Sequence, residues 1–557
     1  MKYICFLWLL LSLTTKTAEN NLNLEDKIAQ LCIIPVISSH DLNRQFIKDS
    51  PYNFGGSYIE SMVTNYNVGG VIFLGAGIPE EQMKSMNRLQ MISKNKLLIA
   101  QDAEWGLSMR LQKDVITLPK AMTLGALSQE DDALIFKLGE EIGKQCKAIG
   151  VDINFAPVVD VNNNPYNPII NVRSFGEDPD CVGRKAKLFM QGMEKMGILC
   201  CAKHFPGHGD TCVDSHCALP IVGHDQKRLD SCELIPFKEL IKANVPMIMT
   251  AHLAVPQITG DNKAATLSSK ILKDLLRIQL KFEGCIITDG LGMKALTNEY
   301  TPGEIELEAL LAGNDILLCP IDLPKVIKRI KQAVQDGEIS EKELDARVVK
   351  MQRLKEKIAK KCFPIAYNKQ LLQSPSCKEL KQQIYRAALT HIGNQLKSLQ
   401  PTETIDLVTI SDKSDEPFAQ YLQKYCQVHE HFIAIAQSSD AYENIVSQLT
   451  SKTKILIALH LASRSGMIEM TNNSESNSNC VNLIQKLRDK TILVLFGNPY
   501  NLSKWDDAKT TLIAYENTPE AQEAAARALA GKLQPRGKLP VLQEKQLSLF
   551  DSLVKKQ

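Results

Sequence analysis

Short apolar runs of strand length recur over the first 320 residues, and longer stretches with apolar residues at helical spacing lie between them. Eight runs predict strands, at Leu31–Pro35, Val68–Phe73, Leu97–Asp102, Val151–Val161, Cys200–His204, Val245–Leu253, Gly284–Asp289 and Asp315–Pro320. Helical spacing is clear at Asp131–Ile149, Arg184–Met196 and Arg228–Ala243. Strands that alternate with helices predict a parallel sheet, and eight repeats favour a closed (β/α)8 barrel over a doubly wound open sheet.

A second, shorter α/β region follows a basic helical segment, Glu341–Lys361, and a linker-like stretch, Phe363–Ser376. Its expected strands are Ile405–Ile410, His431–Ala436, Lys454–His460, Thr491–Gly497 and Thr511–Glu516. Helices are expected at Pro417–Tyr425 and Pro519–Leu529, and the polar stretch Thr471–Asn479 predicts a surface loop. The fold class is therefore α/β, a barrel followed by a smaller open α/β sandwich. The expected divisions are a signal peptide at 1–20, the barrel at 22–362, a linker and helix at 363–400 and the sandwich at 401–557.

The N-terminal segment and the charge balance bear on location and partners. The apolar run Ile4–Leu13 follows Lys2 and has the length of a signal-peptide core, too short for a comfortable membrane span. We therefore expect an exported protein, periplasmic or secreted, with no integral membrane span after signal removal; a buried N-terminal helix is the alternative. The 65 basic and 63 acidic residues leave a net charge of +2, which excludes charge-driven binding to nucleic acid.

Polar side chains end four of the predicted barrel strands. They are Asp102 on the third strand, Lys203 and His204 on the fifth, His252 on the sixth and Asp289 on the seventh. A charged side chain at the end of an apolar run is costly unless it is paired or used, and the carboxyl ends of barrel strands carry the active sites of this fold. Several such residues on one face predict a functional pocket.

The densest polar segment is the stretch 203–216, which reads KHFPGHGDTCVDSH. Its glycines and proline predict a loop that brings backbone close to another group. Three readings fit its residue types equally well. It holds a metal ion; or it performs acid/base catalysis, with Asp214 orienting His216 and favouring its protonated form; or it is a structural loop whose histidines hydrogen-bond backbone.

The same segment resembles the signature loop of the β-N-acetylglucosaminidases within glycoside hydrolase family 3, in which Lys-His-Phe-Pro-Gly-His-Gly-Asp-Thr is followed by Asp-Ser-His. Other members, such as the β-glucosidases, keep Lys-His and lack Asp-Ser-His. The resemblance continues in NVRSFGEDP at 171–179, MTAH at 249–252, TDGLGM at 288–293, GNPY at 497–500, Gly531-Lys532 and GKLPV at 537–541. It thus extends over nearly the whole chain beyond the N-terminal segment.

The resemblance implies roles for individual residues. Asp289 takes the place of the catalytic nucleophile, and His216, held by Asp214, takes the place of the general acid/base. The positions that bind the sugar hydroxyls are Asp102, Arg173, Lys203 and His204. His208 and Asp210 receive supporting roles. No metal and no cofactor is implied, and the expected partner is an oligosaccharide or glycan substrate.

These residue types suit retaining glycoside hydrolysis, in which a carboxylate attacks the anomeric carbon while an acid protonates the leaving oxygen. A histidine, with an ordinary pKa of about 6.5, serves as acid and then as base near neutrality. For Asp289 the alternative is a helix N-cap, and His252 is expected to support the pocket wall by a hydrogen bond. Trp105 stands where the family has glycine and is expected to pack in the core.

The expected activity is removal of terminal β-linked N-acetylglucosamine, with peptidoglycan or related glycans as the substrate class. A phosphorylase that resolves the same covalent intermediate with phosphate is one alternative, and a catalytically silent glycan-binding protein is another. A metal-dependent hydrolase is a further alternative. Cys212 and Cys217 flank the Asp214–His216 pair, and in an exported protein they are candidates for a disulfide that restrains the loop.

Overall fold

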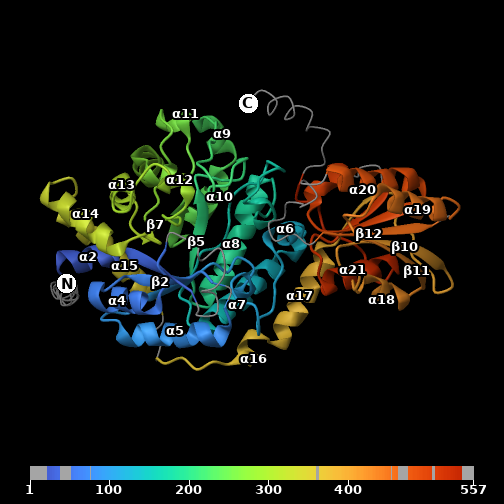
Figure 1. Cartoon of the computed structure of the whole chain (residues 1–557), viewed down its shortest axis with the longest axis horizontal. Coiled ribbons are helices and arrows are strands. Elements are labelled where there is room, and N and C mark those ends of the chain that lie inside the picture. The colour runs from blue at the N-terminus through green and yellow to red at the C-terminus, as the bar shows by residue number, and fades with distance from the viewer. Residues whose placement is uncertain are drawn as a thin grey trace, which may run out of the picture.

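We describe the protein from a computed structural model. It describes residues 22–37, 52–75, 77–358, 363–452, 454–461, 474–504 and 509–541. Two domains lie side by side, the first coloured blue to yellow and the second orange to red in Figure 1. The predicted signal peptide, 1–20, lies outside the described residues. Among the helices of the described ranges, none is both long and apolar enough to cross a membrane.

Eight parallel strands form the sheet of the first domain, in the spatial order β7-β6-β5-β4-β3-β2-β1-β8. They are β1 (Cys32–Val36), β2 (Gly70–Phe73), β3 (Leu98–Gln101), β4 (Ile153–Asn154), β5 (Leu199–Phe205), β6 (Met247–Thr250), β7 (Cys285–Thr288) and β8 (Leu317–Leu318). A parallel bridge between Ile287 and Ile316 joins β7 to the residue before β8 and brings the two edges together. The predicted (β/α)8 barrel is confirmed.

The barrel strands are apolar on both faces because each is enclosed between the interior and the helices. Every second residue along a strand points into the barrel interior. Examples are Ile33, Leu98, Ala100, Met247 and Ile287. The intervening residues, such as Ile99 and Ile286, pack outward against the helices. This two-sided burial explains why the strands are continuous apolar runs in the sequence.

Helices surround the barrel. The longer ones are α2 (Leu24–Gln30), α4 (Gly56–Tyr66), α5 (Pro79–Ile92), α7 (Ala133–Ala148), α8 (Pro179–Lys195), α10 (Leu234–Lys242), a π-helix (Lys270–Gln279), α13 (Glu304–Ala312), α14 (Leu323–Gln335) and α15 (Glu341–Lys357). The shorter ones are α6 (Ala121–Gly125), α9 (Gln226–Ser231), α11 (Pro256–Thr259) and α12 (Lys294–Thr297). Local sequence sets their ends: α8 begins with Pro179 after Asp178, whose side chain accepts a hydrogen bond from the Cys181 amide.

The second domain is an open, mostly parallel sheet in the order β11-β10-β12-β13-β14-β9, with β9 antiparallel to β14. Its strands are β9 (Thr390–Gly393), β10 (Thr404–Ile410), β11 (Gln427–Ile433), β12 (Ile455–His460), β13 (Thr491–Phe496) and β14 (Thr510–Ile513). Its helices are α17 (Pro375–Ala388), α18 (Phe418–Gln423), α19 (Ser439–Leu449), α20 (Ser474–Leu487) and α21 (Pro519–Leu529), and the short helix α16 (Lys369–Leu372) precedes them in the linker, beside α7. Helices α17, α18 and α21 cover one face, and α19 and α20 cover the other (Figure 1).

Four local predictions differ from the structure. Strand β9 was not expected, because its four residues form a partly exposed edge without an apolar run. The stretch Thr471–Asn479 is not a loop throughout, since α20 begins at Ser474. The expected strand His431–Ala436 lies earlier, at Gln427–Ile433, because alternation on an edge strand left the register open. The linker Phe363–Ser376 contains the short helix α16 and the start of α17.

The second domain braces one loop of the barrel, the segment between β4 and α8. The Tyr500 hydroxyl donates to the carbonyl oxygen of Asn162 at 2.5 Å and accepts from the Asn162 side-chain amide at 2.9 Å. The side-chain amide nitrogen of Asn498 donates a hydrogen bond to the side-chain oxygen Oδ1 of Asn171. The Glu177 amide donates to the carbonyl oxygen of Pro540 at 3.1 Å. Arg173 belongs to this loop, so the second domain helps to fix its position.

Helices α7 and α8 pack closely through glycines, which generates a stability prediction. A Cβ atom at Gly192 would lie 2.1 Å from the carbonyl oxygen of Phe136, whereas one at Gly56 would meet nothing within 4 Å. Gly192→Ala is expected to lower the free energy of unfolding by about 1–3 kcal/mol, because backbone must shift to make room. Gly56→Ala is the matched control and is expected to be neutral or slightly stabilising in its helix. Urea denaturation measures both, and equal stability of the two variants would contradict the packing argument.

Candidate active site

The predicted site residues meet at the carboxyl ends of the barrel strands. Asp102 follows β3, Lys203 and His204 lie in β5, and Asp289 follows β7. Arg173 reaches the same face from the loop after β4, where it ends the short helix Asn171–Arg173. Hydrogen bonds and ion pairs link most of them directly, and His216 reaches the group from the loop after β5.

Lys203 lies between two carboxylates in the centre of this face. Its Nζ is 2.9 Å from Asp102 Oδ1 and 2.8 Å from Glu104 Oε1, and the Lys203 side chain is 3% exposed. Arg173 donates from Nε and Nη2 to the two oxygens of Glu104, at 2.9 and 2.8 Å. Arg110 donates to Asp102 Oδ2 at 2.7 Å. The result is a chain of alternating charges that fixes each side chain in place.

The charges in this network remain ionised. Burial alone would raise the pKa of Asp102, but Lys203 and Arg110 lower it to well below the ordinary value. For Glu104, Arg173 and Lys203 likewise outweigh burial and lower the pKa. The pKa of Lys203 is raised, because Asp102 and Glu104 outweigh the burial that would lower it. The network therefore presents permanent charges at fixed positions.

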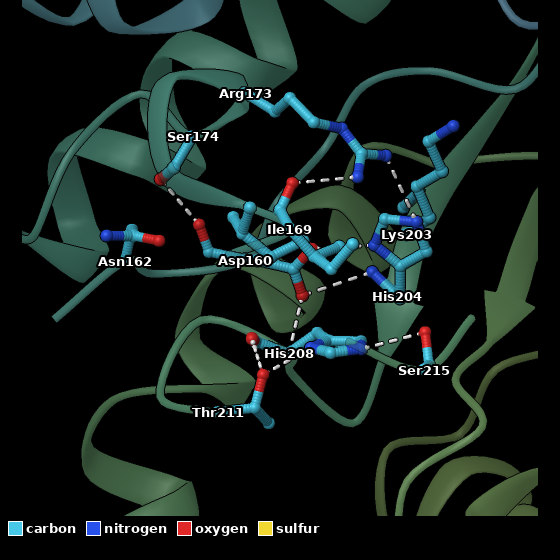
Figure 2. A network of polar contacts seen from close by, with 12 residues as sticks. Asp160, Asn162, Ile169, Arg173, Ser174, Lys203, His204, His208, Thr211 and Ser215 are labelled. Atoms are coloured by element: carbon cyan, nitrogen blue, oxygen red, sulfur yellow. Dashed lines mark hydrogen bonds and ion pairs between the residues drawn. The ribbon is translucent and has the colours of Figure 1, made fainter. Parts of the chain in front are cut away.

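Asp160 organises the backbone around His204, as Figure 2 shows. Its Oδ2 lies 2.7 Å from His204 Nδ1, and its Oδ1 accepts from the amides of His204 and His208 at 3.2 and 2.7 Å. The His208 ring contacts the Thr211 hydroxyl at 2.7 Å, and burial lowers its pKa to about 4. His208 is therefore a neutral structural histidine near pH 7, in agreement with a supporting role.

Asp289 is partly buried at the end of β7, and its Oδ1 accepts from the Gly290 amide at 2.7 Å. Burial would raise the pKa of this carboxyl, but His204, His252, the Gly290 amide and Lys203 together lower it below the ordinary value. Asp289 is not a helix N-cap, since the next helix starts at Lys294 with Met293 in the cap position. It is an ionised carboxylate without a structural role of that kind.

His216 and Asp214 form a hydrogen-bonded pair on the loop after β5. His216 Nδ1 lies 2.8 Å from Asp214 Oδ1, and the His216 side chain is 64% exposed. The hydrogen bond to Asp214 raises the pKa of His216 above the ordinary value, and the charge of Asp289 adds to the effect. The Ala295 amide donates to the carbonyl oxygen of Ser215 at 3.3 Å, which joins this loop to α12, the short helix that follows Asp289.

Four further residues near the site were the subject of sequence predictions. His252 contacts the Thr266 hydroxyl at 2.8 Å and the carbonyl oxygen of Gly290 at 3.0 Å, so it supports the backbone beside Asp289 as expected. Trp105 is only partly buried, with Lys120 Nζ 5.5 Å from its ring centroid, so the expectation of core packing is wrong. Cys212 and Cys217 are free and exposed thiols, so the structure contains no disulfide between them.

Sequence reasoning missed Glu104, Asp160 and Arg110, which hold the predicted residues in place. Glu104 lies two residues after Asp102, next to Trp105, and received no role in the sequence analysis. Asp160 lies next to the last residue of a long apolar stretch, Val151–Val161, and a carboxylate near the end of such a stretch is the signal that indicates it. Arg110 follows β3 at a distance along the chain that no pattern in the sequence indicates.

Comparison with known proteins places the chain. Residues 23–354 match the family model described as the glycosyl hydrolase family 3 N terminal domain. Beta-hexosaminidase A of Pseudoalteromonas piscicida is 30% identical over 485 residues, which cover 78% of this chain and 81% of that protein. Beta-hexosaminidase LpqI of Mycobacterium tuberculosis is 31% identical over 349 residues, 59% of this chain and 82% of that protein. The solved glycoside hydrolase family 3 beta-N-acetylglucosaminidase from Paenibacillus sp. str. FPU-7 is 28% identical, with a TM-score of 0.77 over 94% of this chain and 99% of that one.

The barrel fold, the family model and the relatives named above together define the class of the protein. The protein is a glycoside hydrolase. With the family model matched over more than half of its length, the chain belongs to glycoside hydrolase family 3.

The ion-pair network generates a prediction about acid stability. The lowered pKa values of Asp102 and Glu104 mean that their contribution to stability is complete above about pH 4–5 and is lost as pH falls through the lowered values. Lys203→Met is expected to lower the free energy of unfolding at pH 7 by about 3–5 kcal/mol, because it leaves buried charge uncompensated. The same substitution should also reduce the loss of unfolding free energy between pH 5 and pH 3, because without Lys203 the folded-state pKa values of Asp102 and Glu104 both rise.

Urea denaturation at pH 3, 5 and 7 measures both effects. Lys195→Met is the matched control: Lys195 is 58% exposed and its Nζ lies 2.7 Å from Glu140. Loss of an exposed pair costs at most about 1 kcal/mol. If Lys203→Met retained the acid dependence of the wild-type protein, the network would not hold these carboxylates ionised.

Proposed function

We propose that the protein is a retaining β-N-acetylglucosaminidase in which Asp289 is the nucleophile and the Asp214–His216 pair is the general acid/base. The observation that carries the proposal is the exposed, hydrogen-bonded Asp214–His216 pair on a loop that contacts α12, the first helix after Asp289. The names of the relatives, two beta-hexosaminidases and one beta-N-acetylglucosaminidase, support the choice of sugar.

The first step transfers the sugar to the enzyme. A carboxylate oxygen of Asp289 donates an electron pair to the anomeric carbon, and the bond from that carbon to the leaving oxygen breaks. His216 donates a proton to the leaving oxygen. Because its Nδ1 is bound to Asp214, the atom that faces the substrate is Nε2. The raised pKa of His216 keeps more of it in the protonated form that this step needs.

The second step releases the sugar. Neutral His216 accepts a proton from water through Nε2, and the water oxygen attacks the anomeric carbon of the glycosyl–Asp289 ester. The ester bond breaks, and Asp289 returns to its carboxylate form. The surrounding positive groups, which lower the pKa of Asp289, also make it a better leaving group in this step.

The fixed charges around Asp289 bind the sugar hydroxyls in this proposal. Asp102 accepts hydrogen bonds, while Lys203, Arg173 and His204 donate them or complete the wall of the pocket. Their mutual ion pairs hold them on strand ends before the substrate arrives, so little ordering is left for binding. Peptidoglycan fragments with terminal β-linked N-acetylglucosamine are the proposed natural substrates, and export through the N-terminal segment is part of the same proposal.

The roles of Asp289 and His216 are tested with aryl β-N-acetylglucosaminides whose leaving phenols differ in acidity. Asp289→Asn is expected to reduce turnover of every substrate to the blank rate. In kcat/KM, which reports the first step, His216→Ala should slow a substrate with a poor leaving group by about 10²–10⁴-fold and affect the nitrophenyl substrate far less, because nitrophenolate departs without a proton. A uniform loss across the series, or no loss, would remove His216 from the acid role. Phosphate added to the assay separates the alternatives: a sugar phosphate product would make the protein a phosphorylase.

The role of Asp214 is tested by the pH dependence of kcat/KM. Activity needs protonated His216, so it falls as pH rises through the pKa of His216. Asp214 raises this pKa. In Asp214→Asn the alkaline limb of the profile is therefore expected to move to lower pH. Asp230→Asn, which removes an exposed carboxylate paired with Lys238, is the control and should leave the limb in place. An unshifted limb in Asp214→Asn would show that Asp214 does not tune the acid.

A further inference from the structure

Two histidines and an aspartate converge at the edge of the second domain, away from the barrel. His429 and His431 lie on the edge strand β11, and Asp406 lies on its neighbour β10. Parallel pairing places His429 directly beside Asp406, and His431 follows two residues later on the same face. Strand register, rather than a loop, therefore brings the three side chains together. Figure 1 shows β11 at the outer end of the molecule, in the domain that does not carry Asp289.

The ligand atoms of this cluster all lie within 4.8 Å of one another, close enough to share one metal ion. Asp406 Oδ1 lies 3.0 Å from His429 Nδ1 and 3.2 Å from His431 Nε2. The two imidazole ring centroids are 4.5 Å apart. A tetrahedral zinc ion with bonds of about 2.0–2.2 Å separates its ligand atoms by about 3.3 Å. The three residues are the only His, Cys, Asp and Glu side chains in the described part of the chain whose ligand atoms gather this closely.

The surroundings hold two of the ligands in place and leave the third open. The side chains of Asp406 and His431 are 8% and 12% exposed, whereas His429 is 64% exposed. Lys452 Nζ lies 3.5 Å from the second carboxylate oxygen, Asp406 Oδ2. Oδ1 is thus left as a single-oxygen ligand, and the solvent side gives an ion access and room for water as a fourth ligand.

We propose that Asp406, His429 and His431 bind a divalent transition-metal ion of the zinc type. Two imidazoles select Zn²⁺, Ni²⁺ or Cu²⁺ over Mg²⁺ and Ca²⁺, which prefer all-oxygen ligand sets. The ion replaces the two N–H···O hydrogen bonds by metal–ligand bonds and cross-links β10 to β11.

This role suits the position, because β11 is an edge strand of the sheet that the described residues form. An ion that joins it to β10 fixes the outermost strand of the sheet. The effect is on stability and on the structure of the edge, and it needs no contribution from the barrel. The proposal therefore stands or falls independently of the glycosidase mechanism.

The test uses the full chain, stripped of metal with a chelator that is then removed. Zn²⁺ titration by calorimetry, and the visible absorption of Co²⁺ added in its place, are compared for the wild type and variants. The His429→Ala/His431→Ala double variant is expected to lose one equivalent of bound Zn²⁺ and the tetrahedral Co²⁺ bands. Zn²⁺ should also raise the melting temperature of the wild type more than that of the double variant.

His391→Ala is the matched control, because it removes a histidine from β9, the opposite edge strand of the same sheet, and should bind Zn²⁺ as the wild type does. His429→Ala alone, at an exposed position, should fold normally and weaken Zn²⁺ binding at least tenfold. This single variant tests the metal site even if the double variant is unstable. Unchanged stoichiometry and affinity in His429→Ala, or an equal loss in His391→Ala, would overturn the proposal. Zn²⁺ bound only at the barrel histidines would be retained in both and would count against it.

Discussion

Lys203 sits almost fully buried between two carboxylates, and the geometry of the barrel's C-terminal face follows from keeping these charges paired. A lysine in an apolar interior is tolerated only with partners. Asp102 and Glu104, from the segment that follows β3, provide them, and each carboxylate pairs with an arginine, Arg110 or Arg173. One ion-pair network thereby joins β3, β5 and the loop after β4. The polar groups around Asp289 are held by charge pairing as much as by the apolar core below them.

The fold could be predicted from the sequence where burial is two-sided and continuous. The eight barrel strands are apolar on both faces, so each leaves a run of the right length, and even the two-residue β4 was found within a longer run. Prediction failed where burial is partial. Strand β9 and the register of β11 are edge features, and half-exposed positions carry both polar and apolar residues. The start of α20 was missed because its first turn is polar.

The residues proposed to act on the substrate could be named from the sequence, whereas the residues that hold them in place mostly could not. Asp102, Lys203, His204 and Asp289 each end an apolar run, and the motifs around Arg173 and His216 identified them by resemblance. Asp160 and Arg110 were not predicted, because their roles depend on which atoms the folded chain brings within hydrogen-bond distance. The same holds for Asp406 and His429, which are 23 residues apart and meet only through strand pairing. Contacts between strands are decided by register, which a single sequence does not encode as a local pattern.

The brace between Tyr500 and Asn162 has a consequence for the candidate pocket. The loop that carries Arg173 satisfies part of its hydrogen bonding with side chains of the other domain. Those partners lie more than 300 residues further along the chain. The position of the loop therefore depends on how the second domain sits against the barrel as well as on the barrel itself. A substitution at the boundary between the domains, such as Tyr500→Phe, can reach Arg173 without touching any residue of the candidate pocket.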